Sequence, residues 1–336
     1  MRPLADRRRI LPALALLFIC ADPSPAMAQV VEAVGGRALG MAGAFVALAD
    51  DSTATWWNPA GLTDGPILDL GLGWASADIN REFPAREGQG SWFSIGVQPF
   101  GISYYRLRIT NIPTAPDGAG REDGGAIVPV RSLSASQFGG TVAHTLMGGL
   151  QVGTTLKYVR VSGLASEMVA PVSAGPPEVL EQAASLDAGA AEGAFDLDIG
   201  VLMFQGPVRI GGVVRNVLEP VLSGVTMSRM VRVGAAYEGV KVVKVPLTLS
   251  ADVDLVDYGT TSGDRQVVAI GGEGWTSGRR LGIRAGARFN LVGAQERAVT
   301  TGVSVAIRRG LYVDGHLAYG GASDEGGWGV AARASF

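Results

Sequence analysis

The sequence predicts an all-β protein: a transmembrane antiparallel β-barrel of about 14 strands with an N-terminal, mostly helical hatch inside the barrel. The composition is apolar, because only 18% of the 336 residues are charged and the mean hydropathy is +0.24. Yet no run of about 18 apolar residues after position 28 could serve as a membrane helix. Only helices and closed barrels satisfy every backbone polar group in lipid, and from about residue 66 the residues alternate with the period of a strand.

Residues 1–28 have the features of a secretory signal peptide. Arg7, Arg8 and Arg9 form a basic start, an apolar stretch follows, and Ala26-Met27-Ala28 provides the small residues of a cleavage site. The one cysteine, Cys20, lies in this segment, so the exported chain would offer no disulfide, thiolate metal site or cysteine nucleophile. The net charge of −3 gives no reason to expect nucleic acid as a partner.

About fourteen segments within 66–336 show the alternation of a barrel strand. It is clear in 281–290, where Leu281 and Ile283 share one face and Arg284 lies on the other. Membrane strands tilted near 45° need about 9–11 residues, which is close to the length of most segments. The segments lie near 67–79, 90–98, 100–109, 132–146, 149–162, 194–204, 207–218, 229–238, 246–258, 266–275, 280–290, 298–308, 311–320 and 327–336, with 90–98 and 266–275 alternating poorly.

The connections between these segments alternate between short and longer ones. Outer-membrane barrels have short periplasmic turns, longer external loops and an even strand count, and the sequence fits this pattern. The two longest connections are 110–131 and 163–193, and within the second the stretch 178–188 could form a short helix. A soluble sandwich or propeller would also alternate, but sandwich domains have about 100 residues and no internal repeat indicates propeller blades.

Residues 29–65 do not follow the strand pattern. Small and apolar residues dominate the stretch 36–49, and an acidic pair and an Asn-Pro turn follow it. A barrel of about 14 strands would leave an open lumen unless something filled it. This segment is the only sizeable non-strand stretch on the expected periplasmic side, so it is the candidate plug. The alternative, a disordered leader, fits poorly with its two tryptophans and its turn.

The run GRALGMAGAFVALADDSTATWWNPAGL, residues 36–62, resembles the N-terminal signature of the FadL-like outer-membrane transport proteins. It is also similar to the related PorV and PorQ barrels of type IX secretion. Both families carry R-A-x-G-x-x-G-A, an acidic pair and N-P-A-G-L. The resemblance implies that residues 29–65 pack inside the barrel as a hatch. The matching positions are Arg37, Gly40, Gly43, Asp50, Asp51, Asn58, Pro59 and Gly61.

Alternation places charged side chains of both signs on the inward faces of the strands. Rings of one sign would indicate an ion-selective pore, and this mixture does not. The plainer interpretation is that these charges hydrate the lumen and pair with one another or with the hatch. A sharper hypothesis is that Arg284, Arg288 and Arg333 bind Asp50 and Asp51. The inward candidates are Arg232, Asp252, Asp254, Arg284, Arg288, Asp314 and Arg333.

The sequence gives little support for catalysis. Serine chemistry needs a base held near the nucleophile, and only His144 and His316 are available, with no G-x-S-x-G elbow. No metalloprotease, phosphate-loop or calcium-loop motif occurs. We therefore expect a protein that is not an enzyme and that uses neither a metal nor a cofactor.

The family resemblance implies a function in the outer membrane of a Gram-negative cell. The resemblance to FadL-like proteins implies passive uptake of small hydrophobic compounds, such as long-chain fatty acids, through the lumen and a lateral opening in the wall. The PorV-like alternative is a barrel that binds secreted protein cargo at the cell surface. The expected partners are outer-membrane lipid and either a hydrophobic small molecule in the lumen or such a cargo protein.

Overall fold

The computed structural model describes residues 33–79, 83–113, 121–122, 125–186, 189–242, 245–260, 263–293, 296–320 and 326–336. The expected signal peptide, residues 1–28, lies outside these described residues. So do the first residues of the expected hatch, 29–32.

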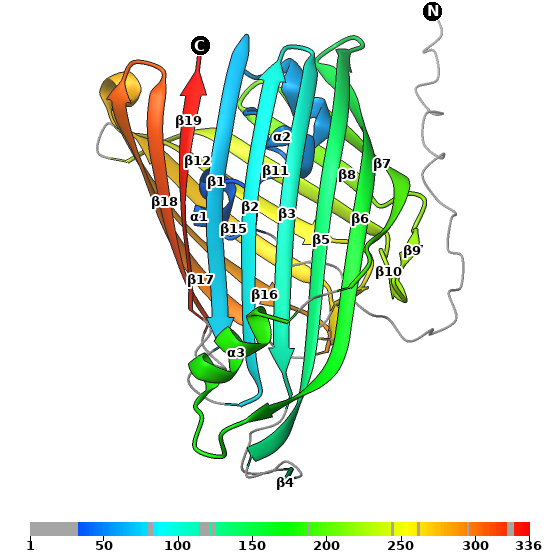
Figure 1. Ribbon diagram of the computed structural model, residues 1–336. Helices are drawn as coiled ribbons and strands as arrows, with labels where there is room; N and C mark the ends of the chain where they lie inside the picture. The colour runs from blue at the N-terminus through cyan, green and yellow to red at the C-terminus, as the bar shows by residue number, and fades with distance from the viewer. Residues whose placement is uncertain are drawn as a thin grey trace, which may run out of the picture.

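Fourteen long antiparallel strands in the described part of the chain close into a barrel (Figure 1). Each pairs with the next long strand along the chain, and β1 also pairs with β19, which completes the wall. Every segment predicted from alternation corresponds to one strand. The strands are β1 Leu68–Ile79, β2 Ala85–Val97, β3 Phe100–Ile112, β5 Gly125–Thr145, β6 Leu150–Ala170, β7 Glu192–Gln205, β8 Val208–Arg215, β11 Met230–Val242, β12 Val245–Asp254, β15 Val267–Trp275, β16 Leu281–Asn290, β17 Arg297–Arg308, β18 Leu311–Gly320 and β19 Gly326–Ser335.

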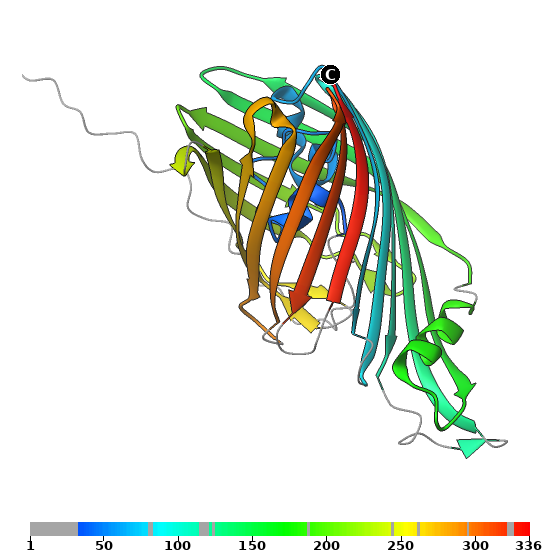
Figure 2. The same ribbon diagram turned by 90° about the vertical axis from the view of Figure 1, so that its left-hand side faces the viewer.

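The two rims of the barrel differ. At the short-turn rim, tight connections such as 98–99 and 309–310 join neighbouring strands, and η3 Ser277–Arg279 lies in one of them. At the long-loop rim, the ends of β5 and β6 extend further than the other strands of the wall, together with α3 (Figure 2). The small elements of this rim are β4 Arg121–Glu122, α3 Pro176–Ala184, β9 Val221–Leu222, β10 Val225–Thr226, β13 Tyr258–Thr260 and β14 Gly263–Arg265.

Two stretches that the sequence assigned to loops belong to strands. β5 and β6 are 21 residues long each, so both 125–131 and 163–170 lie in strands, and 126–131 pair with 165–170. The helix α3, which the sequence placed within 178–188, packs on this extension. Val128 and Met168 are buried against Val179 of the helix. Apolar burial under α3 therefore stabilises strand pairing that alternation alone did not reveal.

The outer face of the wall is apolar. Large side chains are exposed at outward positions on every side of the barrel. Six of them are register neighbours on six successive strands, and we call them the aromatic row: Leu72, Phe93, Tyr104, Phe138, Tyr158 and Phe195. Within the described residues, no helix is long and apolar enough to cross a membrane.

Residues 33–65, which we call the interior segment, lie inside the barrel (Figures 1 and 2). Almost all of them are buried. The expectation of a mostly helical segment is wrong for the described part. Its helices have only five, four and five residues, and turns and irregular backbone connect them. They are α1 Gly36–Gly40, α2 Ala54–Trp57 and the 3₁₀ helix η1 Pro59–Thr63.

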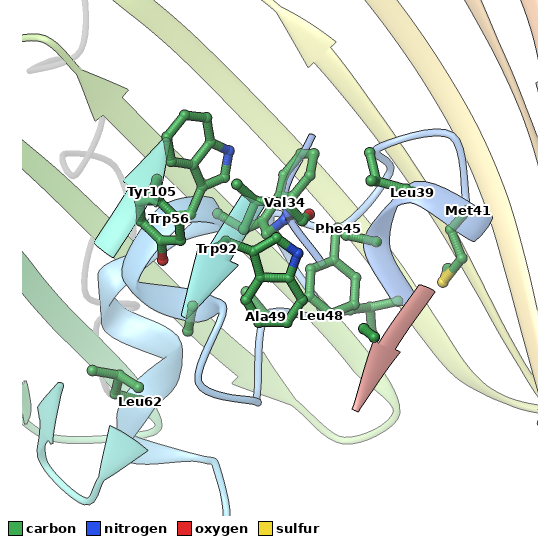
Figure 3. Close-up of a cluster of buried hydrophobic side chains, with 14 of the residues drawn as sticks. Val34, Leu39, Met41, Phe45, Leu48, Ala49, Trp56, Leu62, Trp92 and Tyr105 are labelled. Carbon is green, nitrogen blue, oxygen red and sulfur yellow. Dashed lines mark hydrogen bonds between the residues drawn. The ribbon is translucent and has the colours of Figure 1, made fainter. Parts of the chain in front are cut away.

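The core of the molecule is the contact between the interior segment and the wall. Val34, Phe45 and Leu48 are fully buried and pack beside wall side chains such as Trp92 and Tyr105 (Figure 3). The small residues of the segment let its backbone lie against the wall. The hydrophobic core of this protein therefore sits in the lumen rather than between two sheets.

Candidate functional site in the barrel lumen

Arg37 lies in α1 and is buried among carboxylates. Its Nε donates to both carboxylate oxygens of Glu273, at 3.1 and 3.0 Å, and its Nη2 donates to Glu273 at 2.5 Å. Its Nη1 donates to Asp50 and lies 3.6 Å from Asp51. Burial alone would lower the pKa of Arg37, but Asp50, Glu273 and Asp51 together raise that pKa well above its usual value. Arg37 therefore stays charged wherever the protein is folded.

Further ion pairs join this arginine to the wall. Arg284 on β16 donates from Nε to Glu273 at 2.9 Å and lies 3.9 Å from Asp314. Arg333 on β19 lies 3.6 Å from Asp314 and 3.9 Å from Asp51. Cations and anions alternate through the set, so each buried charge has a neighbour of opposite sign. Such compensation is what makes buried charges tolerable.

The acidic pair of the interior segment has partners that differ in part from the hypothesis. Asp51 does approach Arg333, as proposed. Asp50 instead binds Arg37 of its own segment and lies 4.0 Å from Arg209 on β8. The hypothesis overlooked that the segment carries its own arginine, and this arginine lies nearer than the wall.

The other two arginines of the hypothesis do not contact the acidic pair. Arg284 is bound by Glu273, which lies between it and the interior segment. Arg288 is half-buried and lies in a cavity beside His316. Glu273 is thus the residue that sequence reasoning missed. It belongs to a segment that alternates poorly. Glu273 is nevertheless an even number of residues from Val267 and Trp275, so a strand would place all three on the same, inward face.

The remaining inward candidates divide into two groups. Asp252 on β12 accepts hydrogen bonds from the backbone N–H groups of Phe45 and Val46, at 2.8 and 2.9 Å, so it binds the interior segment. Asp254 instead accepts hydrogen bonds from Arg232, at 2.6 and 3.1 Å, so it joins two neighbouring strands of the wall. Both arrangements give a buried carboxylate the donors that it requires.

The N-P-A-G-L residues form the turn that the sequence predicted. Asn58 donates from Nδ2 to the carbonyl oxygens of Val46 and Val201, both at 2.9 Å, and so joins the segment to β7. Pro59 then begins η1. A Cβ at Gly61 would lie 1.5 Å from the backbone oxygen of Ala49, so only glycine fits there.

The two glycines of the first half of the motif serve different purposes. Gly43 has a φ of +84°, which other residues rarely adopt. Gly40 packs against the wall, where a Cβ would come within 3.1 Å of the Cα of Gly302. The motif is therefore a device for bringing backbone close to backbone inside the barrel.

A first cavity, the aromatic cavity, opens between α2 and the wall. It encloses about 40 Å³, and Met227, Met230 and Tyr258 contribute to its lining. Trp56 and Tyr105 meet edge to face there, with ring centroids 4.9 Å apart. The guanidinium of Arg215 lies 3.6 Å from the centroid of the Trp56 ring. The cavity is thus mainly apolar, with two cations, Arg215 and Arg265, in its lining. The remaining lining residues are Leu107, Ala135, Gln137, Val159, Asn216 and Thr260, together with Ser136, which lies between Ala135 and Gln137 on β5 and whose side chain faces outward.

A second cavity, the polar cavity, encloses about 50 Å³. Leu39 of the interior segment and Leu107 form its apolar side, and Leu107 also lines the aromatic cavity. Arg288, Thr300 and His316 form its polar side. No group of three or more potential metal ligands occurs here or elsewhere among the described residues.

The regular strand ladder of the wall ends early where the aromatic cavity meets β8. The ladder between β7 and β8 ends at the pair Ile199 and Val214, although β7 continues to Glu192. Asn216 has a φ of +54°, which turns the chain away after Arg215.

One backbone hydrogen bond, from the N–H of Val217 to the carbonyl oxygen of Leu197 at 3.0 Å, continues beyond the ladder, and side chains add further bonds. Asp198 accepts from the backbone N–H of Asn216 at 2.9 Å, and Asp196 accepts from that of Leu218 at 3.0 Å. Lys157 binds Asp198 at 2.5 Å and lies 3.3 Å from Asp196. An interruption of the β7–β8 ladder, bridged by one backbone hydrogen bond and by side chains, therefore borders the cavity.

No family model matches the chain, and no curated protein matches it. Solved structures do. The toluene transporter TodX of Pseudomonas putida has a TM-score of 0.60 at 12% identity, over 92% of this chain and 98% of that one. The chain has the fold of the FadL-like channels. The CymD monoaromatic hydrocarbon channel has a TM-score of 0.60 at 14% sequence identity, and the match covers 90% of this chain and 97% of that one. A FadL homologue of Pseudomonas aeruginosa has a TM-score of 0.59 at 10% sequence identity, and the match covers 91% of this chain and 99% of that one.

None of these three structures is a secretion barrel of the PorV and PorQ kind. That second resemblance stays a prediction from the sequence.

Proposed function

We propose that the protein is an outer-membrane channel for the passive uptake of small hydrophobic compounds. The observation that carries this proposal is the aromatic cavity beside the break between β7 and β8. Two further observations support it. The outer face of the barrel is apolar, as lipid contact requires. The fold is similar to those of channels described as transporting toluene or monoaromatic hydrocarbons.

The interior segment acts in this proposal as the hatch. It fills the lumen, and the cavities beside it hold about 40 and 50 Å³, little more than a few water molecules. Hydrophilic solutes are therefore excluded at rest. The ion pairs of Arg37 hold the hatch against the wall, so the route for a ligand passes beside the hatch and does not require its removal.

The ligand in this proposal is a compact apolar molecule. A ring that buries about 150 Å² would gain about 4 kcal/mol, which corresponds to millimolar affinity and to easy release. The aromatic cavity must widen to hold such a ring, and the flexible side chains of Met227 and Met230 allow this. A long-chain fatty acid is a finer possibility, in which Arg215 or Arg265 would meet the carboxylate.

The route out of the cavity is lateral. Apolar compounds cannot readily cross the polar surface of an outer membrane, but they partition into its hydrocarbon. The sealed break at β7 and β8 lies between the cavity and the lipid, and Asp196, Asp198 and Lys157 seal it. Local opening there would release a ligand sideways into the membrane.

A cavity-filling variant tests the proposal. Ala135→Trp places a large ring in the aromatic cavity, and we expect it to reduce uptake of labelled toluene by about tenfold or more. The matched control is Gly140→Trp, which adds the same side chain to the same strand on the outer face, where nothing lies within 4 Å. Both variants should reach the membrane in equal amounts.

Unchanged toluene uptake by Ala135→Trp would contradict the proposal. A parallel measurement with a labelled long-chain fatty acid separates the two ligand classes. Normal uptake of both compounds with a loss of surface-attached proteins would favour the secretion alternative.

A further inference from the structure

The outer wall carries a polar band directly beyond the aromatic row, on its side toward the long-loop rim. Strand register defines the band, because residues two positions further along each strand are again neighbours and again face outward. We call this set the arginine row: Trp74, Ser91, Arg106, Ser136, Arg160 and Gly193.

Two arginines dominate this row. Arg106 on β3 and Arg160 on β6 flank Ser136 on β5, and both arginines are exposed. Within the described residues, no ion pair or hydrogen bond occupies either guanidinium. The neighbouring strand makes room for one of them, since a Cβ at Gly193 would lie 3.3 Å from Cγ of Arg160 and 2.3 Å from the hydroxyl of Tyr158.

On the six strands that carry the arginine row, the outward residues of the adjacent rows are free of negative charge within the part of the chain that the structure describes. Its members carry no carboxylate, and the next row adds Arg108, whose Nη2 donates to the carbonyl oxygen of Ala184 at 2.7 Å. Arg108 thus serves the end of α3. The first outward acids, Asp78 and Glu87, lie one row further still. The local charge is therefore positive.

The arginine row lies next to aromatic side chains on the outer face, which is where lipid headgroups meet a membrane barrel. Aromatic girdles mark the boundary between hydrocarbon and headgroups, and a charge on the lipid face is costly in the hydrocarbon but not at that boundary. Arginine binds phosphate through two parallel hydrogen bonds and is the preferred residue for this purpose. Two strand spacings, about 10 Å, separate Arg106 from Arg160, and both side chains can reach a group above Ser136.

We infer that Arg106, Ser136 and Arg160 bind the phosphate of a phosphorylated membrane lipid whose acyl chains lie along the aromatic row. Charge complementarity selects the headgroup. The apolar side chains of Tyr104, Phe138 and Tyr158 next to it select a lipid over a free phosphate ion. The inference relies on the proposed location in a membrane, but it is independent of what passes through the lumen.

Lipid binding by the purified full-length barrel tests this inference. In neutral detergent, native mass spectrometry compares a phosphorylated lipid A with the same lipid after removal of its phosphates. We expect the wild type to bind the phosphorylated form about tenfold more tightly. The variant Arg106→Gln/Arg160→Gln should bind both forms equally. Inorganic phosphate at the same concentration should not displace the lipid.

The control variant is Arg297→Gln/Arg309→Gln, which removes two exposed arginines of β17 and its turn. It should keep the wild-type preference. Wild-type binding by Arg106→Gln/Arg160→Gln would overturn the inference, as would equal binding of the dephosphorylated lipid or displacement by inorganic phosphate. Toluene uptake is measured separately on the same variants, so that failure of lipid binding and failure of the proposed channel function remain distinguishable.

Discussion

Arg37 is buried between Glu273 on β15 and Asp50 of its own segment, and its guanidinium contacts both carboxylates. Taking these charges out of water is costly, and good geometry offsets the cost. The result is a contact that favours one position of the interior segment over others, because any displacement leaves a charge uncompensated.

We predict that Arg37→Ala destabilises the barrel by about 3–5 kcal/mol, because removing one partner of a buried pair leaves the others unpaired. The free energy of unfolding in urea, measured in lipid vesicles, tests this. The same variant should also increase leak conductance in planar bilayers, since the interior segment loses its attachment to the wall.

The control is Arg229→Ala, which breaks the exposed pair with Glu219 at 2.9 Å. Exposed pairs contribute about 0–1 kcal/mol, so this variant should match the wild type in both measurements. An equal effect of the two substitutions would show that Arg37 has no special role.

The sequence placed several of these residues correctly but not their partners. The motif brought Arg37, Asp50 and Asp51 together in one segment, and they are neighbours in the structure. Alternation also put Arg284 in the lumen. It could not show that Glu273 lies between Arg37 and Arg284, because the choice of partner depends on how the segment sits against the wall.

Among the elements, β8 is the one whose length bears on function. It has eight residues, against 14 in its neighbour β7, so beyond Ile199 the edge of β7 that faces β8 is bridged by one backbone hydrogen bond from Val217 and by side chains. Its end lies beside the aromatic cavity, where Asn216 turns the chain inward. If ligands leave sideways, this is where the wall must open.

A reversible crosslink tests the lateral route. The register partners Ile199 and Val214 form the last pair of the ladder, and cysteines at both positions can form a disulfide across it. We predict that oxidation reduces toluene uptake severalfold and that a reducing agent restores it. The control places cysteines at the register partners Ile283 and Val303 on β16 and β17. An equal loss in the control would contradict a route at β7 and β8.

The elements themselves were largely predictable, because period-2 alternation marks a strand that has one apolar face. The extensions 125–131 and 163–170 were not, since there α3 covers the outward face and both faces become partly buried. The end of β8 was not predictable either. The segment 207–218 alternates beyond Arg215, yet the chain leaves the wall after that residue.

For the molecule as a whole, the apolar composition is explained by location. Apolar side chains cover the outer wall, and many of the charges are paired in the lumen. A polar interior held by ion pairs and an apolar exterior are what a membrane barrel requires. The mixed signs of the lumen charges, which the sequence did reveal, serve to fasten the interior segment, beside which the aromatic and polar cavities are small.

In the proposed function, hydrophobic compounds cross the outer membrane through this barrel. The most direct measurement is the initial uptake rate of labelled toluene in cells with and without the protein, with a labelled sugar of similar size as the reference solute. We predict that loss of the protein lowers toluene uptake severalfold and leaves sugar uptake unchanged. Equal toluene uptake in both strains, or an equal loss for the sugar, would contradict it.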